Sequence, residues 1–224
     1  MNLSFDLGNL PSLKQLVYDH LLQMIIHGDL MPGERLAEDA LSQSMNISRA
    51  PIREALNMLE RDGFASIIPR KGAVVSSITN KDIRDIWTCR LALEPFAAKL
   101  SIHLIPEKAA SDLLQELVSL AAAPYDLDRY IRSDIEVHEL LYKYLDNAYL
   151  KSILENLKAH SIRMRWLNEK LNSDPTYYLL PTKEHQHILE CILKRDEDAL
   201  FHAVQQHLID SSVRTQNPSW EDPA

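Results

Sequence analysis

The sequence predicts a mainly α-helical protein, in which an N-terminal winged helix-turn-helix domain with a small β-hairpin wing precedes an all-helical antiparallel bundle. Three observations support this fold class. The chain of 224 residues contains only 5 Gly and 4 Phe, and it is rich in residues that favour helices. Apolar residues recur at helical spacing through most of its length. Paired β-branched residues flank a turn in one short segment, and no strand pattern is visible after Thr79.

Three helices are predicted in the N-terminal region. The first begins after Ser12, which can act as an N-cap, and ends at Gly28. A Pro-Gly turn then leads into a short second helix with Arg35 at its start. A third helix begins after Ser48 and ends at Gly63. Two short helices joined by a tight turn are typical of a helix-turn-helix motif.

The segment FASIIPRKGAVVSSI, residues 64–78, predicts a two-stranded hairpin. The pairs Ile67–Ile68 and Val74–Val75 supply β-branched residues on either side of the turn-forming sequence PRKG. An isolated hairpin is only marginally stable, but it can form a wing when it packs against helices. The order helix, helix, helix, hairpin therefore predicts a winged helix-turn-helix domain.

From residue 79 onward the pattern predicts about six helices, separated by polar or proline-containing segments. Pro106 and Pro181 suit helix starts, where a missing N–H has little cost. Pro95 predicts a kink or a split in the first of these helices. We therefore expect a winged helix-turn-helix domain over residues 1–77, a helical domain over 78–215 and a flexible polar tail over 216–224.

Composition and charge limit the classes of function. The formal net charge of −8 argues against a protein coated with basic surface, although it allows a local basic edge. The longest apolar stretches are far shorter than a membrane span. No N-terminal secretion signal is recognisable, so we expect a cytoplasmic protein that does not contact the membrane.

Basic residues gather around the predicted helix-turn-helix. Ser48, Arg49 and Arg53 lie at the start of the third helix, which in this motif faces base edges in the major groove. Arginine in that position can pair bidentately with guanine or contact a phosphate. Arg35 is placed to contact a backbone phosphate. The hairpin tip suits an adjacent groove through Arg70, Lys71 and Gly72.

The alternative is that these basic residues are solvated charges on an ordinary surface. We prefer that interpretation for Arg61, which is flanked by Glu60 and Asp62. For Arg49 and Arg53 we favour contact with DNA, because helix, turn, helix and basic wing occur together and in order.

The segment DIEVHELLYKYL, residues 134–145, places a carboxylate and an imidazole in the apolar stripe of a predicted helix. Asp134 and His138 lie four residues apart and so share one helix face. Both side chains are of types that ligate metals. His185 and His207 fall on the apolar stripes of two later helices. Together these residues predict an Asp-His-His-His metal site.

Satisfied core histidines are the alternative, and a single inward histidine would support it. Three of them, with a carboxylate one turn from one histidine, are harder to explain in this way. Spacing alone leaves both interpretations open. His187 and His202, on the same two helices, are predicted to point away from the stripe. The mixed ligand set suits zinc, nickel, manganese or iron about equally well.

The segment LMPGERLAEDALSQSMNISRAPIREALNMLERDGFASIIPRKGAVVS resembles the DNA-binding domain of the GntR family of bacterial transcription regulators, over about residues 10–77. The resemblance rests on PGERL, the serine-arginine helix start, IREAL, the GF at the helix end and the glycine of the wing. In that family the arginine of the ERL element, two recognition-helix arginines and the wing glycine contact DNA. The matching residues here are Arg35, Arg49, Arg53 and Gly72.

Four later segments, TCRLALEPFAAKL, DIEVHELLYKYLDNAYL, KEHQHIL and DALFHAVQQHL, resemble the FadR-type ligand-binding domain of the same family. This resemblance covers about residues 80–213. Many such domains bind a divalent metal through an aspartate, a histidine four residues later and one histidine from each of the last two helices. The matching residues are Asp134, His138, His185 and His207. Val137 departs from the family pattern, which has an aromatic residue there; we expect it to alter the pocket shape rather than the ligation.

The same resemblance implies residues that bind an effector. Arg90, in the element RLALE, matches a family arginine that points into the cavity and pairs with a carboxylate; the alternative is an arginine paired with Glu94. Arg163 lies on another pocket-lining helix, where Arg165 is an equal rival. Asn147 matches an asparagine that follows the ligand-bearing helix, although we interpret it first as a helix cap.

The leading hypothesis is a DNA-binding transcription regulator, of the repressor type, and not an enzyme. A homodimer would place two recognition helices about one helical turn apart on palindromic double-stranded operator DNA. A small organic or sugar acid in the metal-containing cavity would change the affinity for DNA by linkage. The alternatives are a metal-dependent hydrolase and a regulator whose metal is purely structural. No nucleophile elbow, HExxH or phosphate loop occurs, which argues against the hydrolase.

Overall fold

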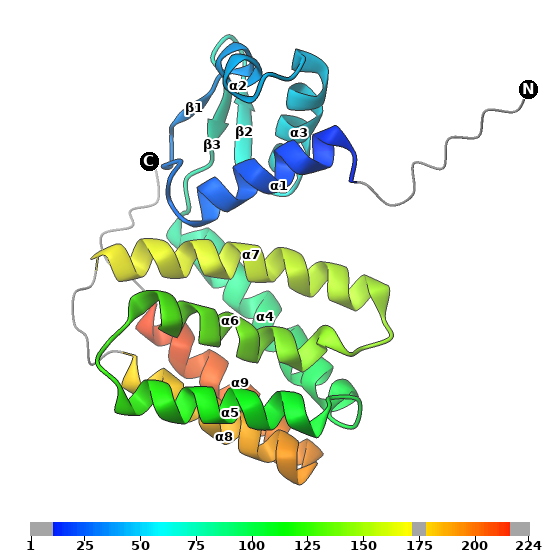
Figure 1. Cartoon of the computed structure of the whole chain (residues 1–224), viewed down its shortest axis with the longest axis vertical. Coiled ribbons are helices and arrows are strands. Elements are labelled where there is room, and N and C mark those ends of the chain that lie inside the picture. The colour runs from blue at the N-terminus through cyan, green and yellow to red at the C-terminus, as the bar shows by residue number, and fades with distance from the viewer. Residues whose placement is uncertain (1–10, 172–177, 216–224) are drawn as a thin grey trace, which may run out of the picture. The chain divides into compact units, whose positions relative to one another are not determined.

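The computed structural model describes residues 11–171 and 178–215, without the side chains of 167–171. The chain divides into two compact units between Ser77 and Ile78 (Figure 1). The predicted fold class is confirmed: the protein is mainly helical, with a helix-turn-helix unit that carries a small antiparallel sheet, followed by a helical unit. The predicted tail, residues 216–224, lies outside the described residues.

The first unit combines three helices with a three-stranded sheet. Its elements are α1 (Leu13–Ile26), β1 (Arg35–Leu36), α2 (Glu38–Met45), α3 (Arg49–Arg61), β2 (Ala65–Ile68) and β3 (Gly72–Val75). Helix α3 packs against α1, α2 and β2, and so lies at the centre of the unit. Its apolar stripe is buried through Ile52, Ala55, Leu56 and Leu59. A leucine or isoleucine side chain stabilises the fold by roughly 1.5–3 kcal/mol when it is fully buried.

The predicted residues Ser12 and Ser48 occupy the N-cap positions of α1 and α3. The Ser12 hydroxyl accepts a hydrogen bond from the backbone N–H of Gln15 at 3.4 Å and caps α1. Ser48 occupies the N-cap position of α3, but its hydroxyl makes no capping hydrogen bond. After α3, Gly63 has a φ of +84°, a conformation that residues with a Cβ rarely adopt, and the chain turns there into β2.

The wing contains a strand that the sequence did not predict. Arg35, expected at the start of the second helix, lies instead in β1, opposite Val74, and the helix begins at Glu38. Leu36 is buried and lies opposite Ala73, so burial of its side chain favours the extended backbone. The N–H of Gly33 donates to the carbonyl of Val75 at 2.8 Å and continues the pairing. The sheet order is β1-β3-β2, with both pairs antiparallel.

The second unit contains six helices among the residues that the structure describes, in agreement with the pattern in the sequence. They are α4 (Asn80–Ser101), α5 (Glu107–Ala122), α6 (Leu127–Lys143), α7 (Ala148–Leu171), α8 (Leu179–Lys194) and α9 (Glu197–Arg214). Helix α4 packs against α6, α7 and α9, whereas α8 packs against α5, α6 and α9 (Figure 1). This arrangement brings the inward faces of α4, α6, α8 and α9 around one core.

Pro95 was predicted to cause a kink or a split; helix α4 continues through it as a single element, so the split does not occur. The helix is well anchored at its start by a reciprocal capping box, in which Thr79 and Asp82 satisfy each other's backbone N–H groups. Pro95 is itself buried, together with Glu94, Ala97 and Ala98 of the same helix. Packing of this face can therefore offset the hydrogen bond that proline removes.

No helix in the described part of the chain combines the length and the apolar composition that a membrane span requires.

Candidate metal centre

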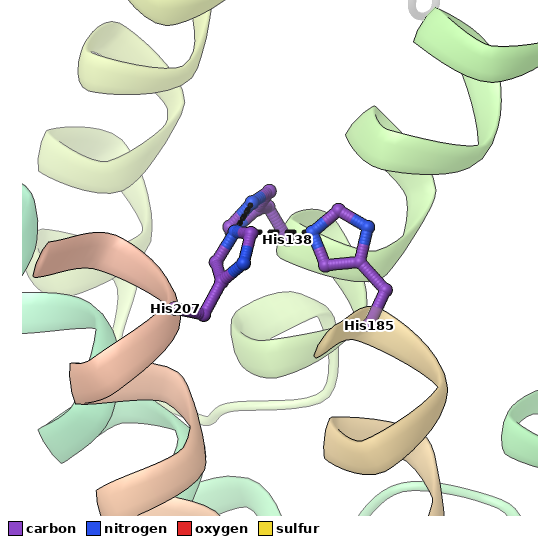
Figure 2. Close-up of side chains that lie close together, drawn as sticks. All are labelled: His138, His185 and His207. Carbon is purple, nitrogen blue, oxygen red and sulfur yellow. Dashed lines mark hydrogen bonds between the residues drawn. The ribbon is translucent and has the colours of Figure 1, made fainter. Parts of the chain in front are cut away.

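Three histidines from three helices meet in the core of the second unit. His138 comes from α6, His185 from α8 and His207 from α9, and their imidazoles turn toward one another (Figure 2). The Nε2 atom of His207 lies 3.1 Å from Nε2 of His185 and 3.2 Å from Nε2 of His138. Each histidine is at most 6% exposed, and one ligand atom from each lies within 4.8 Å of the others.

These separations fit coordination of one ion. Two imidazole nitrogens that each lie about 2.1 Å from a metal, at an angle of 90–110°, are about 3.0–3.4 Å apart. The two measured Nε2–Nε2 distances of 3.1 and 3.2 Å fall in that range. These two pairs therefore already have the spacing that ligation requires.

Asp134 lies beside the histidines. Its Oδ1 atom is 3.6 Å from Nε2 of His185 and 4.0 Å from Nε2 of His138. The same oxygen is buried and accepts no hydrogen bond, although Nη2 of Arg165 lies 2.9 Å away as an ion pair. A buried carboxylate oxygen without a hydrogen bond is costly. A cation next to the three histidines would give this oxygen a second partner beside Arg165, so the donor set fits a divalent metal.

The local sequence explains why these four side chains face inward. On α6, Asp134 and His138 share the buried face with Ile131 and Leu141, at the spacing of one or two helical turns. On α8, His185 continues the buried stripe of Ile188, Leu189 and Ile192. On α9, His207 continues the stripe of Leu200, Val204 and Leu208. The predictions that His187 and His202 point away are confirmed, since both are exposed.

Two glutamates contact the Nδ1 atoms of His138 and His207, the ring nitrogens that face away from the cluster. Oε2 of Glu94, on α4, lies 2.8 Å from Nδ1 of His138, and Oε2 of Glu184, on α8, lies 2.7 Å from Nδ1 of His207. Sequence reasoning missed both contacts. Glu184 precedes His185 directly, so helical spacing placed it off the stripe, and nothing in the sequence indicated that it reaches a histidine on another helix.

The electrostatics favour neutral His185 and His207 and ionised Glu94 and Asp134. Burial lowers the pKa of His185 and of His207 well below the ordinary value. Burial alone would raise the pKa of Glu94, but Arg90 and His138 outweigh it and hold the pKa at about 2. Burial and Arg165 oppose each other in the same way at Asp134, whose pKa is lowered. Neutral imidazoles and an ionised carboxylate are the forms that bind metals.

The predicted effector residues have distinct surroundings. Arg90 is buried and hydrogen-bonded to Glu94, and its Nη2 atom lies 3.2 Å from Nδ1 of His138. Arg165, rather than Arg163, pairs with Asp134, and it also donates to the Tyr130 hydroxyl at 2.7 Å. Arg163 is buried, and burial lowers its pKa to about 10.

Asn147 acts as the predicted helix cap. Its side-chain oxygen accepts a hydrogen bond from the backbone N–H of Leu150 at 3.0 Å, and the residue is exposed at the start of α7. The structure shows no contact between Asn147 and the described residues of the histidine cluster. An effector role for Asn147 stays a prediction.

The residues predicted to bind DNA lie at the surface of the first unit. Arg49 and Arg53 lie in the first turns of α3, and each has a side chain that is 64% exposed. Arg49 forms an ion pair with Asp39, and Arg53 forms one with Glu38, both at the start of α2. The other five predicted residues are also exposed: Arg35, Ser48, Arg70, Lys71 and Gly72.

The hairpin tip has a tight backbone. Arg70 and Gly72 have φ values of +68° and +82°, and the N–H of Lys71 donates to the carbonyl of Ile68 at 3.0 Å. A Cβ added at Gly72 would meet no atom within 4 Å, so the positive φ rather than crowding favours glycine there. The turn therefore presents the two basic side chains between β2 and β3.

A helix-turn-helix unit joined to a helical unit with a buried histidine cluster is the arrangement of a helix-turn-helix transcription regulator. Residues 13–75 match the family of bacterial regulatory proteins called the gntR family, and residues 85–210 match the FCD domain. The chain belongs to the GntR family of transcription regulators and carries an FCD domain, the FadR-type C-terminal domain that the sequence resembles.

Individual relatives agree with this assignment. The HTH-type transcriptional repressor RspR of Escherichia coli K12 is 30% identical, over 98% of this chain and 98% of its own length. The solved structure of McbR/YncC from E. coli has a TM-score of 0.78 at 20% identity and covers 92% of this chain and 98% of that chain. The Zn²⁺-bound FCD domain of the regulator TM0439 has a TM-score of 0.51 at 21% identity. The match covers 62% of this chain and 95% of that chain.

Proposed function

We propose that this regulator is a repressor whose affinity for operator DNA is controlled by a small carboxylate metabolite, bound at a divalent metal in the FCD domain. The observation that carries the proposal is the convergence of three imidazole Nε2 atoms, with separations of 3.1 and 3.2 Å, in a buried site. Repressors among the relatives, such as RspR, support the sign of the regulation.

In this proposal the ion is held by Asp134, His138, His185 and His207. Four protein ligands leave one or two positions open on a five- or six-coordinate ion, and such an ion supplies Lewis acidity toward a carboxylate oxygen. Zinc, nickel, manganese and iron all accept this ligand set. The FCD domain of TM0439 has been solved with Zn²⁺ bound, which makes zinc the first ion to test here.

The cations around the site favour an acidic effector. Arg90 lies beside His138, and Arg165 lies beside Asp134, so two guanidinium groups reach the edge of the cluster. Guanidinium groups pair with carboxylates in a planar, bidentate geometry. A small organic or sugar acid that binds the ion and one arginine would combine both interactions. Arg163 and Asn147 are further candidates to contact it.

DNA recognition is assigned to the exposed basic residues of the first unit. The start of α3 would enter the major groove with Ser48, Arg49 and Arg53, while Arg35 and the hairpin tip contact the flanking backbone and groove. A homodimer would present two such helices to a palindromic operator. Because its target is chromosomal DNA, we expect the protein to act in the cytoplasm. By linkage, the acid changes DNA affinity only as far as it binds the free and DNA-bound forms unequally.

One experiment tests the central claim. Elemental analysis and native mass spectrometry of the purified protein would report the metal, its stoichiometry and any co-purified acid. Operator fragments selected from a random DNA pool would then be titrated with the metal-loaded protein, with and without citrate, malate and gluconate. We expect at least one acid to weaken DNA binding. Metal-loaded protein that is indifferent to every acid would indicate a purely structural ion.

A further inference from the structure

We propose that Glu184 and Glu94 are positioning residues that hold His207 and His138 in the tautomer able to bind a metal. The inference rests on the proposed metal site and adds two residues that do not touch the ion. Each glutamate contacts the Nδ1 atom of its histidine, on the side of the ring opposite to the cluster.

The carboxylate of Glu184 is fixed from two sides. Nη1 and Nη2 of Arg214 donate to its two oxygens at 2.8 and 2.6 Å, and the Nδ1 atom of His207 lies 2.7 Å from Oε2. Arg214 also donates to the Ser211 hydroxyl at 2.9 Å. A carboxylate gripped in a bidentate manner cannot rotate freely. Its oxygen therefore marks a fixed direction for the N–H of the imidazole.

A similar arrangement occurs on His138, where Nη2 of Arg90 also lies 3.2 Å from Nδ1, farther than the oxygen of Glu94. Arg90 donates from Nε and Nη2 to Glu94, and Oε2 of Glu94 lies 2.8 Å from Nδ1 of His138. All three side chains are buried. Two sets of arginine, glutamate and histidine thus meet the cluster, with the glutamate on α4 in one set and on α8 in the other. No sequence spacing relates the two sets.

A neutral imidazole carries a single N–H, so the position of that proton decides which nitrogen can bind a metal. An ionised carboxylate accepts hydrogen bonds and cannot donate, so the ring beside it places its proton on Nδ1 and its lone pair on Nε2. His207 and His138 then present two lone pairs to each other at 3.2 Å. Two acceptors at that distance repel, and a cation between them removes the repulsion. In the other tautomer, Nε2–H of one histidine could donate to its neighbour and close the site without an ion.

The test uses the full chain, zinc as the probe and the variant Glu184→Gln. A glutamine amide can donate to Nδ1, so the variant makes the competing tautomer accessible while keeping the size of the side chain. Loss of an outer partner of a histidine ligand typically weakens metal binding about 10–100-fold. We expect that loss in a competition titration against a chelator, and the same direction of change for Glu94→Gln.

A matched control is available on α5. Glu116 is held by Arg129 through Nε at 2.6 Å and Nη2 at 3.1 Å, the same kind of pair as Glu184 and Arg214. Glu116→Gln removes the same charge from an arginine pair and should leave zinc affinity unchanged. Equal zinc affinity for Glu184→Gln and the wild type would overturn the positioning role. Wild-type protein that binds no zinc would instead overturn the metal site on which the role rests.

Two further measurements separate positioning from stability. In ¹⁵N–¹H spectra of the metal-free wild type, His207 should carry its proton on Nδ1. In the spectra of Glu184→Gln, a population of His207 should carry the proton on Nε2. Thermal unfolding without metal should change less between these two proteins than unfolding with zinc. A wild-type His207 protonated on Nε2, or a variant that loses metal-free stability but keeps its zinc affinity, would assign the glutamate to a structural ion pair only.

Discussion

The Nε2 atoms of His138 and His207 lie 3.2 Å apart, although 69 positions separate these histidines in the chain. Each has a glutamate on its other nitrogen, so the two lone pairs face each other across the core. Two lone pairs at this distance repel each other, so a cation between them would remove an unfavourable contact. The site is therefore expected to couple the stability of the FCD domain to a bound metal.

Removing the metal should lower the thermal stability of the protein. A ligand that binds only the folded state at a free concentration 100 times its Kd stabilises that state by about 2.7 kcal/mol. In a chain of this size this corresponds to a Tm shift of roughly 5–10 °C. Differential scanning calorimetry with zinc, and again after EDTA, measures the shift. An unchanged Tm after verified removal of the ion would contradict the coupling.

Replacing a ligand histidine should abolish metal binding, while replacing its exposed neighbour should not. His185→Ala removes an imidazole that lies 3.1 Å from the His207 ring, whereas His187→Ala changes an exposed residue of the same helix. Loss of a direct ligand should exceed the about 10–100-fold effect typical of an outer partner. Elemental analysis after dialysis would show this as loss of stoichiometric metal in His185→Ala only. Equal metal content in both variants would place the ion elsewhere.

Much of the fold could be predicted because hydrophobic periodicity reports directly on buried faces. The stripe containing Ile188 and Leu189 predicted that His185 faces inward and His187 outward, and both are so placed. Strand β1 could not be predicted in this way, since two residues give no period. Leu36 is extended because it lies opposite Ala73, a contact between positions far apart in the chain. The kink or split at Pro95 was predicted from local propensity, and the split does not occur because tertiary packing overrides that propensity.

The candidate site was only partly visible in the sequence, for a related reason. Spacing identifies which face of a helix a side chain occupies, but not which residue of another helix it meets. The three histidines could therefore be proposed as one site, whereas the contact between Glu184 and His207 could not. Arg163 and Arg165 were equal rivals because they lie only two positions apart on α7. Only the structure shows that Arg165 pairs with Asp134.

The metal-free protein should lose stability as the pH falls below about 6.5. Burial lowers the pKa of His185 and of His207 in the folded state. The unfolded chain takes up protons at these residues near pH 6.5, so below that pH it binds more protons than the folded state. Each histidine then contributes a slope of up to about 1.4 kcal/mol per pH unit. The Tm of EDTA-treated protein should be nearly constant from about pH 8 to 7 and fall toward pH 5.

The control for this pH dependence lies on the same helix. His187 is exposed, and His187→Ala should reproduce the wild-type profile, whereas His185→Ala should give a shallower one. Because the stability in question belongs to the neutral imidazole, it is retained above the unfolded pKa and lost on acidification. A Tm of the metal-free protein that rises between pH 7 and 5 would show that the buried histidines are protonated in the folded state.

Replacing the two arginines at the start of α3 should weaken operator binding without changing the bound metal. Arg49 and Arg53 are exposed and pair only with Asp39 and Glu38 among the described residues, through surface contacts that DNA phosphates can replace. Loss of one arginine–base contact weakens DNA binding on the order of ten- to a hundredfold, and loss of one phosphate contact lowers the salt slope by about one. Fluorescence anisotropy of a labelled operator at several salt concentrations measures both for Arg49→Ala and Arg53→Ala. Arg61→Ala, at the far end of the same helix, is the matched control; operator affinity equal to the control in both variants would remove α3 from the recognition surface.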